Sequence, residues 1–160
     1  MYIYKKIVTL PFAPSTVFKY LTTAGNFPLW LKEVLVAGKA SKETALGSTM
    51  VQTIRILLPR KFSMHVTGFV HDRYFKIEAL KGFGFLPGYS FSLKPVKGNA
   101  TELTVYVQVK CNNEKDQHKL VSFLFPFGVQ HYWDLYHPAW VLLEENGKKC
   151  EMIYGSRMHC

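Results

Sequence analysis

The feature that most constrains the fold of this chain is an alternation of apolar and polar residues. The segment TELTVYVQVKC (residues 101–111) has an apolar residue or cysteine at every second position from Leu103 onward. Successive side chains of a β-strand point to opposite faces, so the pattern predicts a strand with one buried face and one wet face. The segment GYSFSLKPV (residues 88–96) alternates in the same way, and Lys97-Gly98-Asn99 between the two segments predicts a tight turn.

The same period of two extends back to about residue 33 and predicts an antiparallel sheet. Residues 49–57 and 61–70 predict a hairpin around Leu58-Pro59-Arg60, and residues 73–80 predict the strand that follows. Residues 34–38 predict a short strand before this hairpin. The segment YIYKKIVTL (residues 2–10) is rich in residues that favour strands and is followed by Pro11, so it predicts the first strand.

A helical period follows the first strand. The segment APSTVFKYLTT (residues 13–23) predicts a helix that begins at Pro14 or Ser15. The apolar face of this helix consists of Val17, Phe18 and Leu21. The segment NFPLWLKEV (residues 26–34) predicts a second short helical turn.

A helical period also follows the last predicted strand. Residues 116–125 predict a short helix, and about residues 129–146 predict a long one that ends at Gly147. At about 100° per residue, the apolar side chains of the long helix fill one arc. That arc contains Tyr132, Tyr136, Trp140 and Leu143. The polar half contains His131, Asp134, His137 and Pro138, and the proline on this side is expected to bend the helix toward the core.

The order of these motifs resembles the START/Bet v 1-like helix-grip superfamily, in particular its polyketide cyclase/dehydrase-like and lipid-transport branch. The opening APSTVFKYLTTAGNFPLWLKEV is similar to the family's helix start and the tryptophan that closes its second helix. LGSTM, VTGFVHDRYFKIEA and YSFSLKPVKGNATELTVYV are similar to its later strands and turns. The resemblance implies an α+β fold, with a curved antiparallel sheet of about seven strands wrapped around a long C-terminal helix. Two short helices follow the first strand.

The length of 160 residues suits one domain, which we expect over residues 1–149, with residues 150–160 as an unassigned tail. Lysine and arginine number 20 against 11 acidic residues, but these charges are scattered and no nucleic-acid module is recognisable. We therefore expect no nucleic-acid partner. A weak contact with an anionic membrane or an acidic partner stays open, as does the choice between monomer and homodimer.

The cysteines and the apolar runs bear on location. There are three cysteines and no CxxC, which argues against a disulfide framework and a zinc site and favours the cytoplasm. Lys5-Lys6 followed by IVTLPFA loosely resembles a signal peptide, but Pro11 and Pro14 break the run, and a first strand explains it better. No apolar stretch approaches the ~18 residues that a membrane-spanning helix needs.

The reactive side chains suggest no catalytic or metal centre. His131, Asp134 and His137 do not have the i, i+4 spacing of helical zinc ligands, so we expect no metal and no cofactor. His65 and His71 are assigned to a polar strand face, His71-Asp72 also predicts a turn, and no acid–base pair is predicted. The segment KGFGFLPG (residues 81–88) lacks the spacing of a phosphate-binding loop and predicts a connection between strands. Its apolar side chains, Phe83, Phe85 and Leu86, would be flaps over a cavity mouth.

A sheet that wraps around a helix leaves an apolar space, and this space is the expected binding site. The first hypothesis is the binding of a hydrophobic small molecule, namely a lipid, a polyketide or an aromatic compound. The predicted wall residues are Trp30, Met64, Phe85, Tyr89, Phe91, Tyr132, Tyr136, Trp140 and Leu143. The alternative is a cyclase or dehydratase in which Tyr132 or Tyr136 donates a hydrogen bond or a proton. A weaker alternative is a domain that binds a partner or a membrane surface.

Overall fold

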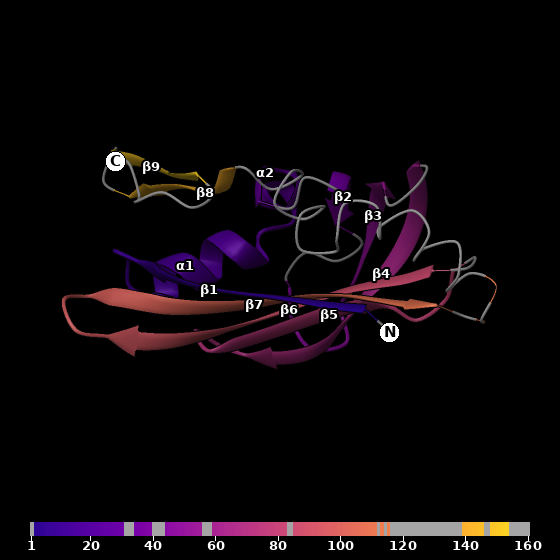
Figure 1. Ribbon diagram of the computed structural model, residues 1–160, viewed down its shortest axis with the longest axis horizontal. Coiled ribbons are helices and arrows are strands. Elements are labelled where there is room, and N and C mark those ends of the chain that lie inside the picture. The colour runs from indigo at the N-terminus through magenta and orange to yellow at the C-terminus, as the bar shows by residue number, and fades with distance from the viewer. Residues whose placement is uncertain are drawn as a thin grey trace.

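A seven-stranded antiparallel sheet forms most of the computed structural model, which describes residues 2–30, 34–39, 44–55, 59–82, 85–111, 113, 115, 139–145 and 148–153 (Figure 1). The strands lie in the order β1-β7-β6-β5-β4-β3-β2. Their bounds are β1 (Tyr2–Leu10), β2 (Val34–Lys39), β3 (Thr49–Arg55), β4 (Pro59–Val70), β5 (Tyr74–Ala79), β6 (Phe85–Val96) and β7 (Ala100–Cys111). Strands β2 to β7 are consecutive neighbours, and β1 pairs with β7, so the predicted sheet is confirmed.

The alternation that predicted the sheet corresponds to its two faces. In β7, Leu103 and Val105 are fully buried and Val107 and Val109 nearly so, while the residues between them are partly exposed. The buried side chains of β3 to β6 continue the same face, which is called the inner face below. Burying apolar area on this face is the main favourable contribution to folding.

Two short helices cover part of the inner face, as the sequence predicts. Helix α1 (Pro14–Thr22) is followed by a 3₁₀ turn, η1 (Ala24–Asn26), and by α2 (Phe27–Trp30). In α1, the buried side chains include Val17, Phe18 and Leu21. The Phe18 ring makes an edge contact with Phe91 of β6, at 6.3 Å between centroids, so the helix is fixed to the middle of the sheet.

The turn between β6 and β7 has the backbone that its sequence predicts. Gly98 has φ +82° and Asn99 has φ +56°, which place both residues in the left-handed region. Glycine and asparagine are the residues that adopt this region most readily, so the tight-turn prediction is confirmed.

Strand β6 begins earlier than the sequence predicts. Phe85 and Leu86, which were expected as loop flaps, lie in β6 opposite Cys111 and Lys110. The prediction was wrong because Pro87 was taken to lie outside the strand. Pairing of β5 with β6 ends at Glu78 and Gly88, so Pro87 lies where β5 no longer pairs with β6, and its missing N–H is tolerated there. Phe83 lies outside the described residues.

The long helix predicted over about residues 129–146 is wrong in its second half. Residues Ala139–Glu145 form a strand, β8, which pairs antiparallel with β9 (Lys148–Ile153). The two residues between these strands are Asn146 and Gly147, and this dipeptide is typical of a two-residue hairpin turn. In Figure 1, α1 lies between the main sheet and this hairpin. The first half of the predicted helix and the short helix at 116–125 lie outside the described residues.

Candidate functional site

The inner face brings together three of the predicted wall residues. Met64 of β4 and Tyr89 and Phe91 of β6 are each 0–1% exposed. Strand β5 separates them and contributes Phe75, whose ring stacks on Phe91 at 5.1 Å between centroids. The assignment of Met64 to the inner face, made from its alternation with Phe62 and Val66, is confirmed. Contact of these residues with a ligand stays a prediction.

Four of the other predicted wall residues are assigned to helices or strands, and two lie outside the described residues. Trp30 lies in α2, Phe85 in β6, and Trp140 and Leu143 in β8. Because β8 is a strand, the helical wheel that grouped Trp140 and Leu143 with the two tyrosines does not apply to them. Tyr132 and Tyr136 lie outside the described residues.

Gln52 is a polar residue on the inner face that the sequence prediction missed. It lies in β3 opposite Phe62 and is 0% exposed. Its amide nitrogen lies 3.3 Å from the Met50 sulfur, and its carbonyl oxygen has no hydrogen-bond partner among the described residues. Gln52 occupies the position between Met50 and Ile54 in the alternation, where an apolar residue is expected. That departure from the pattern is the sequence signal that could have found it.

The buried threonines show by contrast that Gln52 is unusual. The Thr101 hydroxyl donates to the Phe12 carbonyl at 2.7 Å, and the Thr22 hydroxyl donates to the Phe18 carbonyl at 2.8 Å. These side chains are satisfied by the backbone beside them. The carbonyl oxygen of Gln52 is therefore a polar atom on the inner face that can accept a hydrogen bond from a ligand.

Tyr20 supplies a second buried polar atom. It lies in α1, packs against the core, and its hydroxyl has no hydrogen-bond partner in the described part of the chain. Burial raises the pKa of the Tyr20 phenol above its ordinary value. The phenol therefore stays protonated at neutral pH and can donate a hydrogen bond.

A groove of about 640 Å³ lies where α1 meets the turn between β4 and β5. It is lined by Ser15, Phe18, Lys19, Thr22, Thr23, Thr44, Ala45, Phe69, His71 and Asp72. His71 Nδ1 lies 3.1 Å from Asp72 Oδ2, and the His71 ring lies 5.4 Å from the Phe18 ring between centroids. The two polar side chains therefore lie together at the groove, where they can form hydrogen bonds with a small polar molecule.

The structure bears on two predictions at this groove. The predicted turn at His71-Asp72 is confirmed, with Asp72 at φ +58°, and the assignment of His71 to a strand face is wrong. The sequence did not predict that the two side chains contact each other. The error has a tertiary cause, because only the packing of α1 shows that this turn faces a groove. Sequence alone places the two residues beside each other without showing what they line.

The outer face of the sheet is polar around Glu78, as predicted. The Glu78 carboxylate lies 2.8 Å from Lys76 Nζ and 3.6 Å from Lys110 Nζ, and it accepts a hydrogen bond from Gln108 at 3.3 Å. Burial alone would raise the pKa of Glu78, but the hydrogen bond and charge of Lys76, together with Lys110, lower it. The carboxylate is therefore ionised at neutral pH and has a structural role.

Metal-ligand groups and membrane-spanning helices also bear on the kind of site. Among the described residues, no group of three histidine, cysteine or acidic side chains is arranged to hold a metal ion. The residues weighed as metal ligands, His131, Asp134 and His137, lie outside that part of the chain. None of the described helices is long and apolar enough to span a membrane.

Comparison with known proteins shows the fold. No family model and no curated protein matches the sequence. A START superfamily protein from Mycobacterium smegmatis superposes with a TM-score of 0.59 at 15% identity, over 81% of this chain and 93% of that chain. For Ara h 8.0201 the TM-score is 0.53 at 11% identity, over 78% and 93%. For the di-domain ARO/CYC protein BexL it is 0.57 at 7% identity, over 86% of this chain and 46% of that chain.

Proposed function

Because the chain has the helix-grip fold of START and Bet v 1 proteins, we propose that it binds a hydrophobic small molecule on the inner face of its sheet. The ligand is a lipid, a polyketide or an aromatic compound. The observation that carries the proposal is the composition of that face. Met64, Tyr89 and Phe91 share it with Gln52, whose buried carbonyl oxygen has no partner among the described residues.

The carbonyl oxygen of Gln52 also indicates which polar group the ligand contains. A buried polar group without a hydrogen bond lowers the free energy of unfolding by about 1–3 kcal/mol. We therefore expect the Gln52 carbonyl oxygen to have a function. A ligand that donates a hydroxyl or N–H to the Gln52 oxygen removes this cost. The expected ligand is therefore mostly apolar, with a donor group that reaches β3.

Native mass spectrometry of the purified protein tests the proposal. We expect a bound hydrophobic molecule that is released on denaturation. Ligand at saturating concentration should raise Tm by about 5 °C, because a ligand at 100 times its Kd stabilises the folded state by about 2.7 kcal/mol. Absence of a bound molecule, together with no change in Tm across lipids, polyketides and aromatic compounds, would refute the proposal.

A matched pair of variants tests the role of Gln52. Gln52→Leu should weaken binding of the recovered ligand about tenfold, the effect of losing about 1.4 kcal/mol, and should leave the ligand-free protein at least as stable. Thr101→Val is the control, because Thr101 is equally buried and its hydroxyl is bonded to the backbone. It should lower stability and leave affinity unchanged. Equal affinity of wild type and Gln52→Leu would remove Gln52 from the site.

The second candidate function is an enzyme of the cyclase or dehydratase type. The likeness to the ARO/CYC protein BexL favours it. The proposed proton donors are Tyr132 and Tyr136. If either residue acts in this way, Tyr132→Phe or Tyr136→Phe will abolish turnover of a polyketide substrate while ligand binding persists. Full turnover by both variants in a single-turnover assay would exclude these tyrosines.

Two properties belong to the same proposal. The binding domain, expected over residues 1–149, extends through β9 to Ile153, because β9 pairs with β8. The protein acts in the cytoplasm, in keeping with three cysteines and no CxxC. The choice between monomer and homodimer is open to sedimentation equilibrium, which measures the mass in solution.

A further inference from the structure

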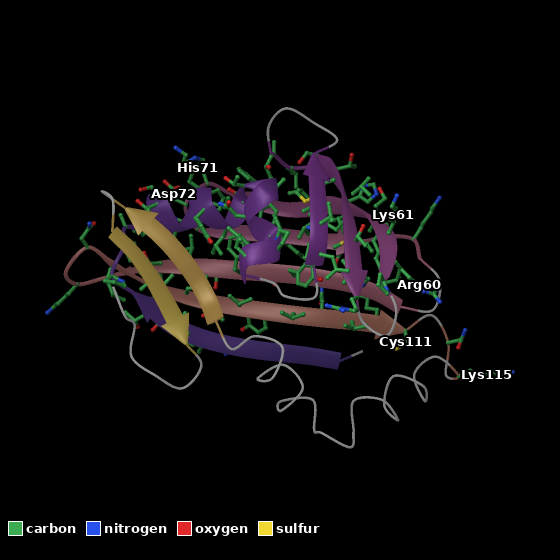
Figure 2. The ribbon with its side chains drawn as sticks, turned by 90° about the horizontal axis from the view of Figure 1, so that it is seen from above. Arg60, Lys61, His71, Asp72, Cys111 and Lys115 are labelled. Atoms are coloured by element: carbon green, nitrogen blue, oxygen red, sulfur yellow. The ribbon has the colours of Figure 1, made fainter. Side chains whose placement is uncertain are left out.

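Three cationic side chains line a groove at one end of the main sheet. The groove has a volume of about 500 Å³ and is lined by Arg60, Lys61, Phe62, Lys81 and Gly82. Arg60 and Lys61 begin β4, and Lys81 follows β5. Continuing the pairing of Met64 with Ala79 by two residues places Phe62 level with Lys81. In Figure 2, Arg60 and Lys61 lie at the end of the molecule opposite His71 and Asp72, so this groove is separate from the one beside α1.

The charge in this groove is not neutralised by the described residues. Arg60, Lys61 and Lys81 are all exposed, and none of them forms an ion pair within the described ranges. The carboxylate of Glu78 is engaged on the outer face by Lys76 and Lys110. None of the described residues that line the groove is acidic. Three like charges around one space favour an anion there.

One residue of the groove also belongs to the apolar inner face. Phe62 lines the groove and is itself only 5% exposed, as a member of the hydrophobic core. Arg60 precedes Phe62 by two positions in β4, so the two residues belong to the same face of the strand. Lys81 follows Ala79 by two positions. The groove therefore combines positive charge at its edge with an aromatic side chain that leads to the core.

We propose that Arg60, Lys61 and Lys81 bind the anionic headgroup of an amphipathic ligand whose apolar part lies against the inner face. The inference rests on the proposed function and names its ligand class, a long-chain carboxylate or phosphate that also has the hydroxyl or N–H donor expected at Gln52. A guanidinium can donate two parallel hydrogen bonds to either headgroup, and the flexible lysines add charge around it. A free inorganic anion and an anionic membrane surface offer the same chemistry, and the experiment distinguishes both.

Isothermal titration with matched probes tests the inference. Laurate, dodecyl phosphate and dodecanol have the same chain and differ in the headgroup. At low salt, wild type should bind the two anions about tenfold more tightly than the alcohol. Arg60→Gln and Lys81→Gln should each reduce this preference about threefold to tenfold and leave dodecanol binding unchanged. Added salt should weaken the preference, because the groove is exposed.

Lys94→Gln is the matched control, because Lys94 is an exposed lysine of β6 close to the β6–β7 turn and outside the groove. It should keep the full preference for the anions. All the substituted side chains are exposed, and circular dichroism should confirm that each variant folds. Lys61→Gln replaces either groove variant that does not fold.

Each contrary outcome has its own meaning. Equal affinity for laurate and dodecanol would overturn the headgroup site and leave the proposed function intact. Binding of inorganic phosphate in the absence of all three dodecyl probes would overturn the headgroup site, because the groove would then bind a free anion. Binding of vesicles of phosphatidylcholine and phosphatidylserine that is lost in Arg60→Gln, with no preference among the soluble probes, would assign the groove to a membrane surface. If no apolar ligand binds wild type at all, the proposed function itself fails.

Discussion

At the scale of single residues, Gly88 explains how a polar network crosses the sheet. Gly88 of β6 lies between Glu78 of β5 and Gln108 of β7 in the pairing of the strands. A Cβ at this position would lie 2.9 Å from Gln108 Nε2 and 3.1 Å from the Glu78 Cβ. Because glycine has no side chain, Glu78 reaches over the central strand to Gln108 and Lys110. The network thus connects β5 to β7 across the strand between them.

The ionisation of Glu78 makes part of the stability depend on pH. The folded-state pKa of Glu78 is below its ordinary value of 4.5, so this stability is present above about pH 4.5 and is lost as the pH falls through the folded pKa. Glu78→Gln should therefore lower the urea midpoint at pH 7, and its difference from wild type should shrink in acid. Glu102→Gln is the control, because Glu102 forms no ion pair among the described residues. A difference that stays constant from neutral to acidic pH would contradict this role.

At the scale of elements, the β6–β7 hairpin was predicted correctly and the β8–β9 hairpin was not. The β6–β7 hairpin was predicted because alternating strands and a glycine-containing turn are both local signals. The segment that forms β8 contains Trp140, Val141, Leu142 and Leu143 in succession, and periodicity alone does not distinguish a strand from a helix in so short an apolar run. This segment forms a strand because it pairs with β9. A helical wheel considers one segment at a time, so it cannot predict this pairing.

The β6–β7 turn provides a test at this scale. Gly98→Ala should destabilise the protein by about 1 kcal/mol, because a residue with a Cβ is strained at φ +82°. Gly25→Ala is the control, since a Cβ there meets no atom within 4 Å and its φ is not positive. It should be neutral or slightly stabilising in urea denaturation. Equal midpoints for the two variants would show that the turn contributes no strain.

At the scale of the whole molecule, the two faces of the main sheet differ in the side chains that they present. The outer face carries the Glu78 network, and the inner face carries the core, Gln52 and the edge that leads to the basic groove. The net charge of +9 seemed scattered along the chain, but pairing of the strands gathers Arg60, Lys61 and Lys81 around one groove. Residues far apart in sequence thus become one site because a β-sheet places the ends of several strands together.

The sequence by itself determined the order of strands in the main sheet, the alternation of buried and exposed residues along most of them, and the two helices after β1. These features depend on periodicity and turn residues, which are local properties of the sequence. Met64, Tyr89 and Phe91 were therefore assigned correctly to the inner face of the sheet. Only the tertiary structure decided that His71 and Asp72 line a groove beside α1, that residues Ala139–Glu145 pair with β9, and that the carbonyl oxygen of Gln52 lies buried without a partner in the described chain. Each of these depends on contacts between distant segments, and the free energy of such contacts is absent from any single stretch of sequence.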